Sequence, residues 1–479
     1  MPDSSPLTGG HRPIVTAAEM RALEAAAIAQ GVSEFELMAR AGHAAARAII
    51  AYAAPADTLV LCGPGNNGGD GYVIALALAE AGWPVRVAAL APSGTDTARQ
   101  AAEGWTGPVE TLDKATAPAS LLVDALFGIG LTRPLDGRLS AILARLGEGA
   151  GTRVAIDLPS GVATDDGACL SPPLACDLCI SFGAAKPAHY LHPAAAHVGR
   201  LVIAPIGLAP AHSDLTVIGK PRFAALDADT HKYRRGHVLV VGGPAHATGA
   251  ARLAALAAQR AGAGYVTLLS PSAALAANAA QLTGVVLAEA DTPRDIAKAL
   301  AEPRAGALVI GPALGPERHK VIAALEVGKP VVLDADVFTL FANDAAGLAK
   351  LIAGPAVLTP HDGEFVRLFG DLPGSKVERV CAAAARIGAV VLLKGPDTVI
   401  AAPDGRAAIN AHASSALATA GSGDVLAGII GALLARGLDP FEAACAGAWL
   451  HGDAGQRGGA GLIAEDLPGL LPAVLADLA

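Results

Sequence analysis

Short apolar runs alternate with helical patterns along most of this chain. The first clear example is the run at 58–62, which leads into a glycine-rich segment at 63–71, a helical pattern over 72–81 and a second apolar run at 85–90. Strand, loop, helix and strand in this order form a βαβ unit, whose two strands are parallel. Because the order is repeated, the sequence predicts a mainly parallel α/β sandwich.

The 479 residues are too many for one hydrophobic core, so more than one domain is expected. Residues 207–222 are rich in proline and small side chains and show no clear periodicity, which favours a domain boundary there and predicts domains of 1–212 and 213–479. The remaining strand-like runs are 121–124, 154–157, 178–182 and 201–204 before this boundary, and 236–241, 265–269, 307–310, 331–333, 356–358, 390–393 and 399–402 after it.

Charge and hydropathy narrow the class of protein. The net charge of -9 argues against nucleic acid or an anionic membrane as the main partner, although local backbone sites can still hold small anions.

The N-terminus lacks a signal pattern, and glycine, proline or charge interrupts each long apolar run, which predicts a cytoplasmic protein. Cys176 and Cys179 form a C-x-x-C without a second ligand pair, so we expect reduced cysteines rather than a zinc site.

The glycine-rich segment does not indicate an ordinary NAD cofactor site. Gly63, Gly65 and Gly68 match G-x-G-x-x-G, but that fingerprint also needs an acid at the end of the next strand. The next strand here ends at Leu90 and is followed by Ala91, Pro92 and Ser93, with no carboxylate.

Polar side chains follow several strands of the first half. Asn67 follows the first strand, Asp124 and Asp157 end two later ones, and Ser160 lies on the adjoining turn. Ligands bind outside the carboxyl ends of parallel strands, so these side chains can converge there. Oxygen-only ligands suit a hard cation. The alternative is that each residue caps a turn or helix.

A second candidate site lies near the C-terminus. Residues 420–424 read Ala-Gly-Ser-Gly-Asp and run directly into an apolar helical pattern over 425–435. The N–H groups at a helix start favour phosphate, which makes a carboxylate at the same place unexpected. Asp424 could be a general base for a hydroxyl that attacks a phosphoryl group, or a simple helix cap. These five residues alone leave both readings open.

With these motifs placed, the chain resembles two known families joined in one protein. The first half is similar to the NAD(P)H-hydrate epimerase family, and the second half to the ADP-dependent NAD(P)H-hydrate dehydratase family. The motifs that carry the resemblance are 65–71, 123–131 with Arg133 and Pro134, and 157–161 in the first half, and 236–238 with Gly242 and Gly243, 311–315, 359–361, 394–395 and 417–428 in the second.

The resemblance implies an α/β protein with a Rossmann-like three-layer domain at 1–212 and a ribokinase-like domain at 213–479. The first would interconvert the R and S epimers of hydrated NADH and NADPH (NADHX and NADPHX). The second would dehydrate the S form with ADP, with Asp424 as its base and magnesium as its metal. A small-molecule kinase would share the second fold, but such a kinase has no use for the first domain. A first domain that only binds a nucleotide is the other alternative.

The resemblance also assigns site residues. In the epimerase domain, the catalytic residue is Asp157, and the hydrate would contact Asn66, Asn67, Gly68, Gly69, Asp70, Gly128, Ile129, Gly130, Leu131, Thr132, Arg133, Pro134 and Asp157. Potassium would be bound by Asn67, Asp124 and Ser160. In the dehydratase domain, the hydrate would contact Ala250, Gly315, His361 and Asp424, and ADP would contact Lys394, Gly395, Pro396, Asp397, Thr398 and Gly423. His361 could instead be a turn residue. We also expect a homo-oligomer with no nucleic acid or membrane partner.

Overall fold

The computed structural model describes residues 10–223 and 229–478 and divides the chain into two compact units. One unit is Pro13–Ser213. The other is Asp214–Ala479 joined by the segment that ends at Arg12. Arg12 lies in β1 (Arg12–Pro13), which is the neighbour of β9 (Leu215–Val217) in the sheet of the second unit. The division therefore differs from the predicted 1–212 domain at its N-terminal end.

The described residues of the first unit form a seven-stranded sheet in the order β4-β3-β2-β5-β6-β7-β8. All of its strand pairs are parallel, as predicted. The strands are β2 (Thr58–Cys62), β3 (Val85–Ala89), β4 (Val109–Thr111), β5 (Leu121–Ala125), β6 (Thr152–Ile156), β7 (Leu178–Phe182) and β8 (Arg200–Ala204).

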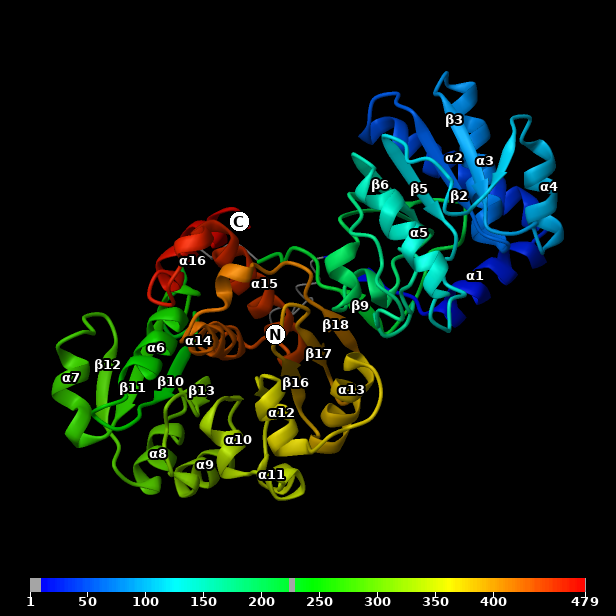
Figure 1. The fold of residues 1–479 in the computed structure, drawn as a ribbon. Coiled ribbons are helices and arrows are strands. Elements are labelled where there is room, and N and C mark those ends of the chain that lie inside the picture. Colours follow the sequence, from blue (N-terminus) through cyan, green and yellow to red (C-terminus); the bar gives the residue numbers. More distant parts are fainter. Residues whose placement is uncertain (1–9, 224–228, 479) are drawn as a thin grey trace. The chain divides into compact units, whose positions relative to one another are not determined.

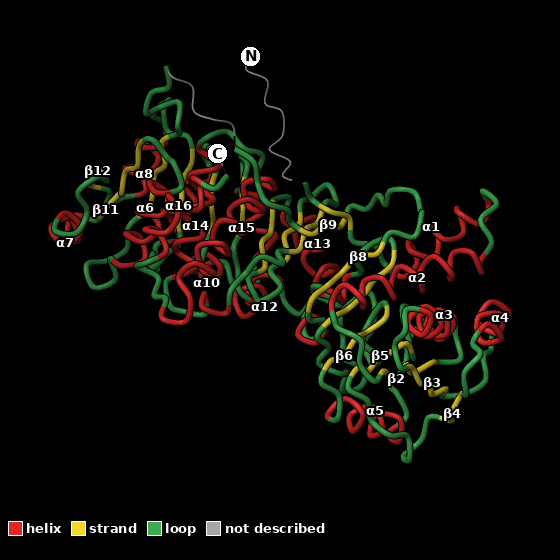
Figure 2. Tube along the Cα trace, turned by 90° about the horizontal axis from the view of Figure 1, so that it is seen from above, coloured by secondary structure: helices red, strands yellow, loops and turns green. Residues whose placement is uncertain are grey.

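Helices cover both faces of this sheet. Val60 and Cys62 of β2 pack with α2 and α3, whereas Leu59 and Leu61 pack with α5 on the opposite face. Figure 2 shows α3 and α4 on one side of the strands and α5 on the other. The helices are α1 (Ala17–Ala29), α2 (Glu34–Tyr52), α3 (Asn66–Glu80), α4 (Asp96–Gly104) and α5 (Gly137–Glu148), with 3-10 turns η1 (Pro187–His189) and η2 (Ala194–His197). The unit therefore has three layers.

The start of α3 differs from the predicted loop at 63–71. The helix begins at Asn66, directly after Gly65 as its N-cap, instead of at residue 72. The close packing of the first turn explains this difference, because a Cβ on Gly68 would lie 1.8 Å from the carbonyl oxygen of Gly63. Only glycine tolerates such an approach. Asn66, Asn67 and Asp70 consequently lie on a helix that starts at the carboxyl end of β2.

The described part of the second unit contains an eleven-stranded sheet in the order β1-β9-β18-β17-β16-β15-β14-β13-β10-β11-β12. It is parallel from β16 to β12, while β17 is antiparallel to both β16 and β18. β9 lies inside the segment that we expected to have no regular structure. The other strands are β10 (His237–Val241), β11 (Tyr265–Ser270), β12 (Val286–Glu289), β13 (Ala307–Ile310), β14 (Val331–Leu333), β15 (Ala356–Leu358), β16 (Val390–Leu393), β17 (Val399–Ala401) and β18 (Ala407–Ile409).

Helices again cover both faces, which confirms the α/β prediction. Figure 1 shows α6, α14 and α16 on one side of β10 and β13, and α8, α9 and α10 on the other. The helices are α6 (Gly249–Arg260), α7 (Leu275–Ala279), α8 (Pro293–Leu300), α9 (Arg318–Leu325), α10 (Asp336–Leu340), α11 (Ala345–Leu351), α12 (Asp362–Phe369), α13 (Lys376–Ile387), α14 (Ser422–Ala435), α15 (Pro440–Gly458) and α16 (Leu467–Ala476), with 3-10 turns η3 (Ser272–Ala274), η4 (Ser415–Leu417) and η5 (Gly459–Gly461). None of the helices in the described ranges is long and apolar enough to cross a membrane.

Candidate active sites in the two units

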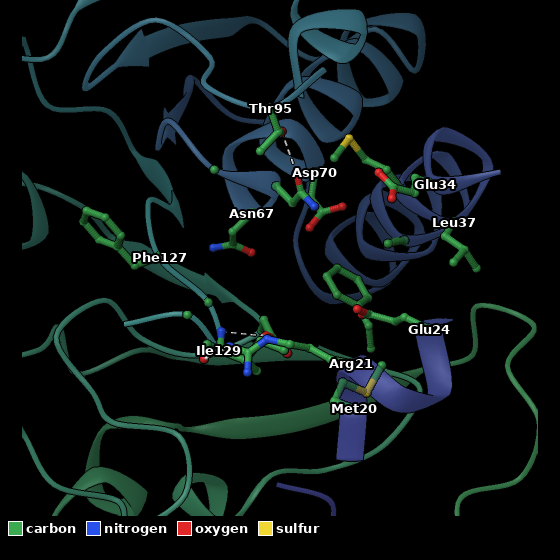
Figure 3. Close-up of a pocket in the computed structure, with 18 of the residues that line it drawn as sticks. Met20, Arg21, Glu24, Glu34, Leu37, Asn67, Asp70, Thr95, Phe127 and Ile129 are labelled. Atoms are coloured by element: carbon green, nitrogen blue, oxygen red, sulfur yellow. Dashed lines mark hydrogen bonds between the residues drawn. The ribbon is translucent and has the colours of Figure 1, made fainter. Parts of the chain in front are cut away.

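A cavity of about 620 Å³ opens at the carboxyl edge of the first sheet. Figure 3 shows Asn67 and Asp70 on one side of it and Arg21 and Ile129 on the other. The predicted hydrate-contacting residues that line it are Asn66, Asn67, Asp70, Gly128, Ile129, Gly130, Leu131 and Asp157. Gly68 and Gly69 are buried in α3, and Thr132, Arg133 and Pro134 are exposed beyond the lining.

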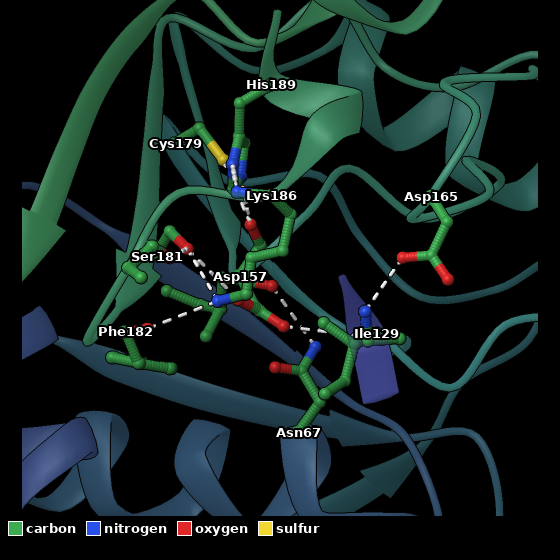
Figure 4. Close-up of polar contacts among 12 residues, drawn as sticks. Asn67, Ile129, Asp157, Asp165, Cys179, Ser181, Phe182, Lys186 and His189 are labelled. Atoms are coloured by element: carbon green, nitrogen blue, oxygen red, sulfur yellow. Dashed lines mark hydrogen bonds and ion pairs between the residues drawn. The ribbon is translucent and has the colours of Figure 1, made fainter. Parts of the chain in front are cut away.

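Asp157 follows β6 and is held in an unusual backbone conformation. Its φ of 66° lies in the left-handed region, which a non-glycine residue adopts only when its surroundings enforce it. Its Oδ1 accepts hydrogen bonds from Lys186 Nζ at 2.6 Å and Ser181 Oγ at 3.3 Å, and its Oδ2 accepts one from the Ile129 N–H at 3.2 Å (Figure 4). The side chain is thus fixed at the wall of the cavity.

His189 contacts the backbone of Asp157. Its Nδ1 accepts the Lys186 N–H at 2.8 Å, so its Nε2 carries the proton and donates to the carbonyl oxygen of Asp157 at 2.8 Å (Figure 4). Burial, followed by the nearby Lys186 charge, lowers the pKa of His189 to about 4. The ring is therefore neutral near pH 7, with one fixed tautomer.

The pKa values of Asp157 and Asp70, two carboxyl groups that line this cavity, are shifted in opposite directions. Burial alone would raise the pKa of Asp157, but the charge and hydrogen bond of Lys186 lower it below its ordinary value. Burial, together with the charges of Asp157 and Glu24, raises the pKa of Asp70 well above its ordinary value. Two carboxyl groups whose pKa values are shifted in opposite directions in one cavity can divide the roles of base and acid.

Asp124 and Ser160 form a buried pair beneath the cavity. Asp124 accepts the Ser160 hydroxyl at 2.7 Å and the Ser160 N–H at 2.9 Å. Asn67 reaches the same strand ends, because its Nδ2 donates to the carbonyl of Ile156 at 3.3 Å. Burial raises the pKa of Asp124, and the opposing influences are hydrogen bonds from Ser160 and Leu126. No basic side chain in the described ranges forms an ion pair with this carboxylate.

The second candidate site lies at the carboxyl ends of five neighbouring strands of the second unit. The loops after β10, β13, β14, β15 and β16 lie at this edge. They approach each other closely, since a Cβ on Gly243 would lie 1.9 Å from the Ala313 carbonyl oxygen and one on Gly311 would lie 1.8 Å from that of Asp334. Glycine is thus required where these loops touch.

The N-terminus of α14 faces this edge. Gly421 is the N-cap with a φ of 90°, so no side chain caps the first N–H groups of the helix. Asp424 lies in the first turn. A Cβ on Gly423 would lie 3.3 Å from Lys394 Nζ, which places the lysine over the helix start. Backbone N–H groups and an ammonium group at one place form a site for phosphate.

Lys394 joins three carboxylates. Its Nζ lies 3.0 Å from Asp334 Oδ1 and 3.7 Å from Glu364 Oε2. Burial would lower the pKa of Lys394, but Asp334, Glu364 and, to a smaller extent, Asp424 raise it above its ordinary value. Asp334 in addition accepts the Thr359 hydroxyl at 2.9 Å. Asp424 has a pKa of about 7, because burial and then the charge of Asp334 raise it, Lys394 opposes the rise and Glu364 adds to it. A carboxyl group with this pKa suits a general base.

The remaining predicted residues take structural positions around this site. His361 is the N-cap of α12, and its Nδ1 accepts the N–H groups of Gly363 and Glu364, while its side chain remains 58% exposed. Gly315 donates its N–H to Asp336 at 2.8 Å. Ala250 lies in the first turn of α6, the helix whose Leu253 lies beside Gly421.

The predicted ADP-binding turn after β16 is held by its own side chains. Thr398 bonds to both the N–H and the carbonyl of Gly395, and Asp397 pairs with Lys376 at 2.6 Å. Pro396 lies between Gly395 and Asp397 in this turn.

Lys186, His189, Asp334 and Glu364 are residues of these sites that were not predicted from the sequence. Asp334 directly follows β14, so its place at a strand end could have indicated it. Lys186, His189 and Glu364 follow no strand directly and carry no such signal.

Comparisons with known proteins identify the family of this chain. The family model described as NAD(P)H-hydrate dehydratase matches residues 238–470, and that described as YjeF-related protein N-terminus matches residues 34–188. A relative from Moorella thermoacetica, called a bifunctional NAD(P)H-hydrate repair enzyme, is 36% identical over 97% of this chain and 97% of its own. A second with the same description, from Salinibacter ruber, is 36% identical over 97% of this chain and 96% of its own.

The chain belongs to the bifunctional NAD(P)H-hydrate repair enzyme family. A solved structure of an ADP/ATP-dependent NAD(P)H-hydrate dehydratase from Bacillus subtilis, co-crystallised with ATP and Mg²⁺, is 31% identical with a TM-score of 0.49 and covers 54% of this chain and 95% of its own. The two relatives, each 36% identical over 97% of this chain, confirm the predicted relationship to the repair enzyme family.

Proposed function

We propose that this protein restores hydrated NADH and NADPH through two activities in one chain. The unit Pro13–Ser213 is the epimerase domain and interconverts the R and S hydrates, and the unit that contains Asp214–Ala479 is the dehydratase domain and acts on the S form with ADP. The observation that carries the proposal is the position of Asp424, a partly buried carboxyl group with a pKa of about 7 beside Lys394 and the bare N-terminus of α14.

The dehydratase chemistry follows from this arrangement. Asp424 accepts the proton of the hydrate hydroxyl while that oxygen forms a bond to the terminal phosphorus of ADP, and the bond to the bridging oxygen breaks with its electron pair leaving on AMP. Phosphate is a better leaving group than hydroxide. The ring nitrogen lone pair then expels phosphate, and loss of a proton from the adjacent ring carbon restores the reduced ring.

The backbone at the start of α14 would stabilise the negative charge that develops on the phosphoryl oxygens. The N–H groups of 421–423 can stabilise the phosphoryl oxygens, and Lys394 supplies a fixed positive charge beside them. Ala250, Gly315 and His361 would line the hydrate, while 395–398 would hold the nucleotide.

The charges at this site also fit magnesium. Asp334, Glu364 and Asp424 surround a single ammonium group, so the site carries excess negative charge on oxygen donors of the kind that magnesium prefers. Asp334 and Glu364 would hold the ion together with the nucleotide phosphates, and the ion would neutralise charge on those phosphates.

In the epimerase domain, Asp157 is the candidate acid/base residue, and Asn66, Asn67, Asp70 and 128–131 would surround the hydrate. Potassium fits Asn67, Asp124 and Ser160, because Asp124 is a buried carboxylate whose described partners are neutral. A monovalent cation would balance its charge. A cytoplasmic location and a homo-oligomer remain predictions.

The purified protein, mixed with both hydrate epimers, ADP and magnesium, should convert all of the hydrate to NADH, which absorbance follows directly. Without nucleotide, a single epimer should equilibrate with the other, as chromatography would show, and no NADH should form. Accumulation of a stable phosphorylated hydrate would indicate a kinase instead. Failure to form NADH from the S epimer would contradict the dehydratase assignment.

The dehydratase rate should depend on pH through Asp424. A general base must be ionised, and the pKa of Asp424 in the metal-free protein is about 7. Magnesium bound by Asp334 and Glu364 would offset the charges that raise this pKa, so kcat/KM should rise with pH up to a value at or below about 7 and level off above it. Below this value it should fall about tenfold per pH unit. Initial rates with the S epimer between pH 5.5 and 8.5 test this. A flat profile across that range would show that another group accepts the proton.

A further inference from the structure

Lys186 is a buried charged residue of the epimerase cavity to which the proposed chemistry gives no role. Its side chain is only 1% exposed. Its Nζ donates to Asp157 Oδ1 at 2.6 Å, Ser181 Oγ at 2.8 Å and the Phe182 carbonyl oxygen at 3.2 Å (Figure 4). An ammonium group has three donors, and all are used. Lys186 therefore has no donor left for a ligand, and any effect on the reaction passes through its partners.

The two oxygens of Asp157 have different surroundings. Oδ1 accepts from Lys186 at 2.6 Å and lies 3.3 Å from Ser181 Oγ, whose one proton can instead go to the Ala184 carbonyl oxygen at 3.1 Å. Among the described residues, Oδ2 accepts one hydrogen bond, from the Ile129 N–H at 3.2 Å. A carboxylate oxygen accepts about two hydrogen bonds, so Oδ2 keeps a free acceptor position. Oδ2 also lies beside the cavity, because a Cβ on the cavity-lining Gly128 would be 3.0 Å from it.

The segment 186–189 binds both the side chain and the backbone of Asp157. Lys186 binds its carboxylate, and His189, three residues later, binds its carbonyl oxygen while accepting the Lys186 N–H. These contacts oppose the strain of the left-handed backbone at Asp157. Without the lysine, the side chain could rotate, and burial would favour its neutral form.

We propose that Lys186 is a positioning residue of the epimerase, which holds Asp157 as a carboxylate with Oδ2 turned toward the hydrate. This inference rests on the proposed epimerase function. Glu24 on α1 and Asp70 on α3 also interact electrostatically with Asp157, and Arg21 on α1 interacts with Glu24. In the described structure, Lys186 is the basic side chain that forms an ion pair with the Asp157 carboxylate.

The test is a double-mutant cycle on the full-length protein with nucleotide left out, so that only epimerisation of a purified epimer is measured. The variants are Lys186→Met, Asp157→Asn and the pair together, with Ser181→Ala as the matched control that removes a neutral donor from the same oxygen. Lys186→Met and Asp157→Asn should each lower kcat about 100-fold with KM changed less than about threefold. Ser181→Ala should lower kcat less than about fivefold.

The double variant distinguishes positioning from an independent role. If Lys186 acts only through Asp157, the pair should be within about threefold of Asp157→Asn. Lys186→Met leaves a buried unpaired carboxylate, which could prevent the single variant from folding. The double variant removes both charges, so its comparison with Asp157→Asn still tests the proposal in that case. A further loss of tenfold or more in the double variant, or unchanged kcat in Lys186→Met, would overturn the proposal. A wild-type protein that does not exceed the spontaneous rate would overturn the epimerase function itself.

Discussion

Asp424→Asn should lower the rate of ADP-dependent dehydration about 10²–10⁴-fold, the range expected when a general base is removed. Asparagine keeps the size of the side chain but cannot accept the hydroxyl proton. The position is partly buried in the first turn of α14, so the isosteric change should leave the fold intact. The measurement is the initial rate of NADH formation from the S epimer at saturating ADP and magnesium, at pH 8.

The same variant carries its own control. Epimerisation without nucleotide depends on the first unit and should proceed at the wild-type rate, which would show that the preparation is folded and active. Dehydration by Asp424→Asn within a factor of ten of wild type would exclude Asp424 as the base and leave it as a residue that shapes the helix start.

Asp157→Asn should divide the full repair reaction into two phases. The S epimer should be converted to NADH at the wild-type rate, because the dehydratase residues are unchanged. The R epimer should then disappear only at the spontaneous rate of epimerisation, because the side chain that we propose as the acid/base residue is gone. The enzymatic part of the second phase should fall about 10²–10⁴-fold.

The expected observation is a time course of NADH absorbance with a fast amplitude equal to the initial S fraction. Addition of the Asp424→Asn variant should restore the second phase in trans, because that variant keeps its epimerase site. A single fast phase that consumes the whole mixture with Asp157→Asn alone would rule out an essential role for this carboxylate.

The positions of most strands along the chain could be predicted from the sequence. The predicted runs at 58–62, 178–182, 307–310, 331–333, 356–358 and 390–393 have the same bounds in the structure. Strands of a parallel sheet are buried on both faces and therefore read as continuous apolar runs. The prediction was wrong at 63–71, which we read as a loop, because close packing between Gly68 and Gly63 lets α3 begin at Asn66.

The sequence by itself determined the α/β class, the positions of most strands along the chain and the carboxylates at their ends, whereas the order of the strands in each sheet came from the structure. Asp124, Asp157 and Asp424 could be found because a strand end or a helix start marks each of them. Only the tertiary structure showed which charges surround these groups. Lys186 lies 29 residues from Asp157, and Lys394 lies 60 residues from Asp334. The protonation state of a buried carboxyl group depends on such distant neighbours and on the depth of burial, and neither is encoded in a local pattern.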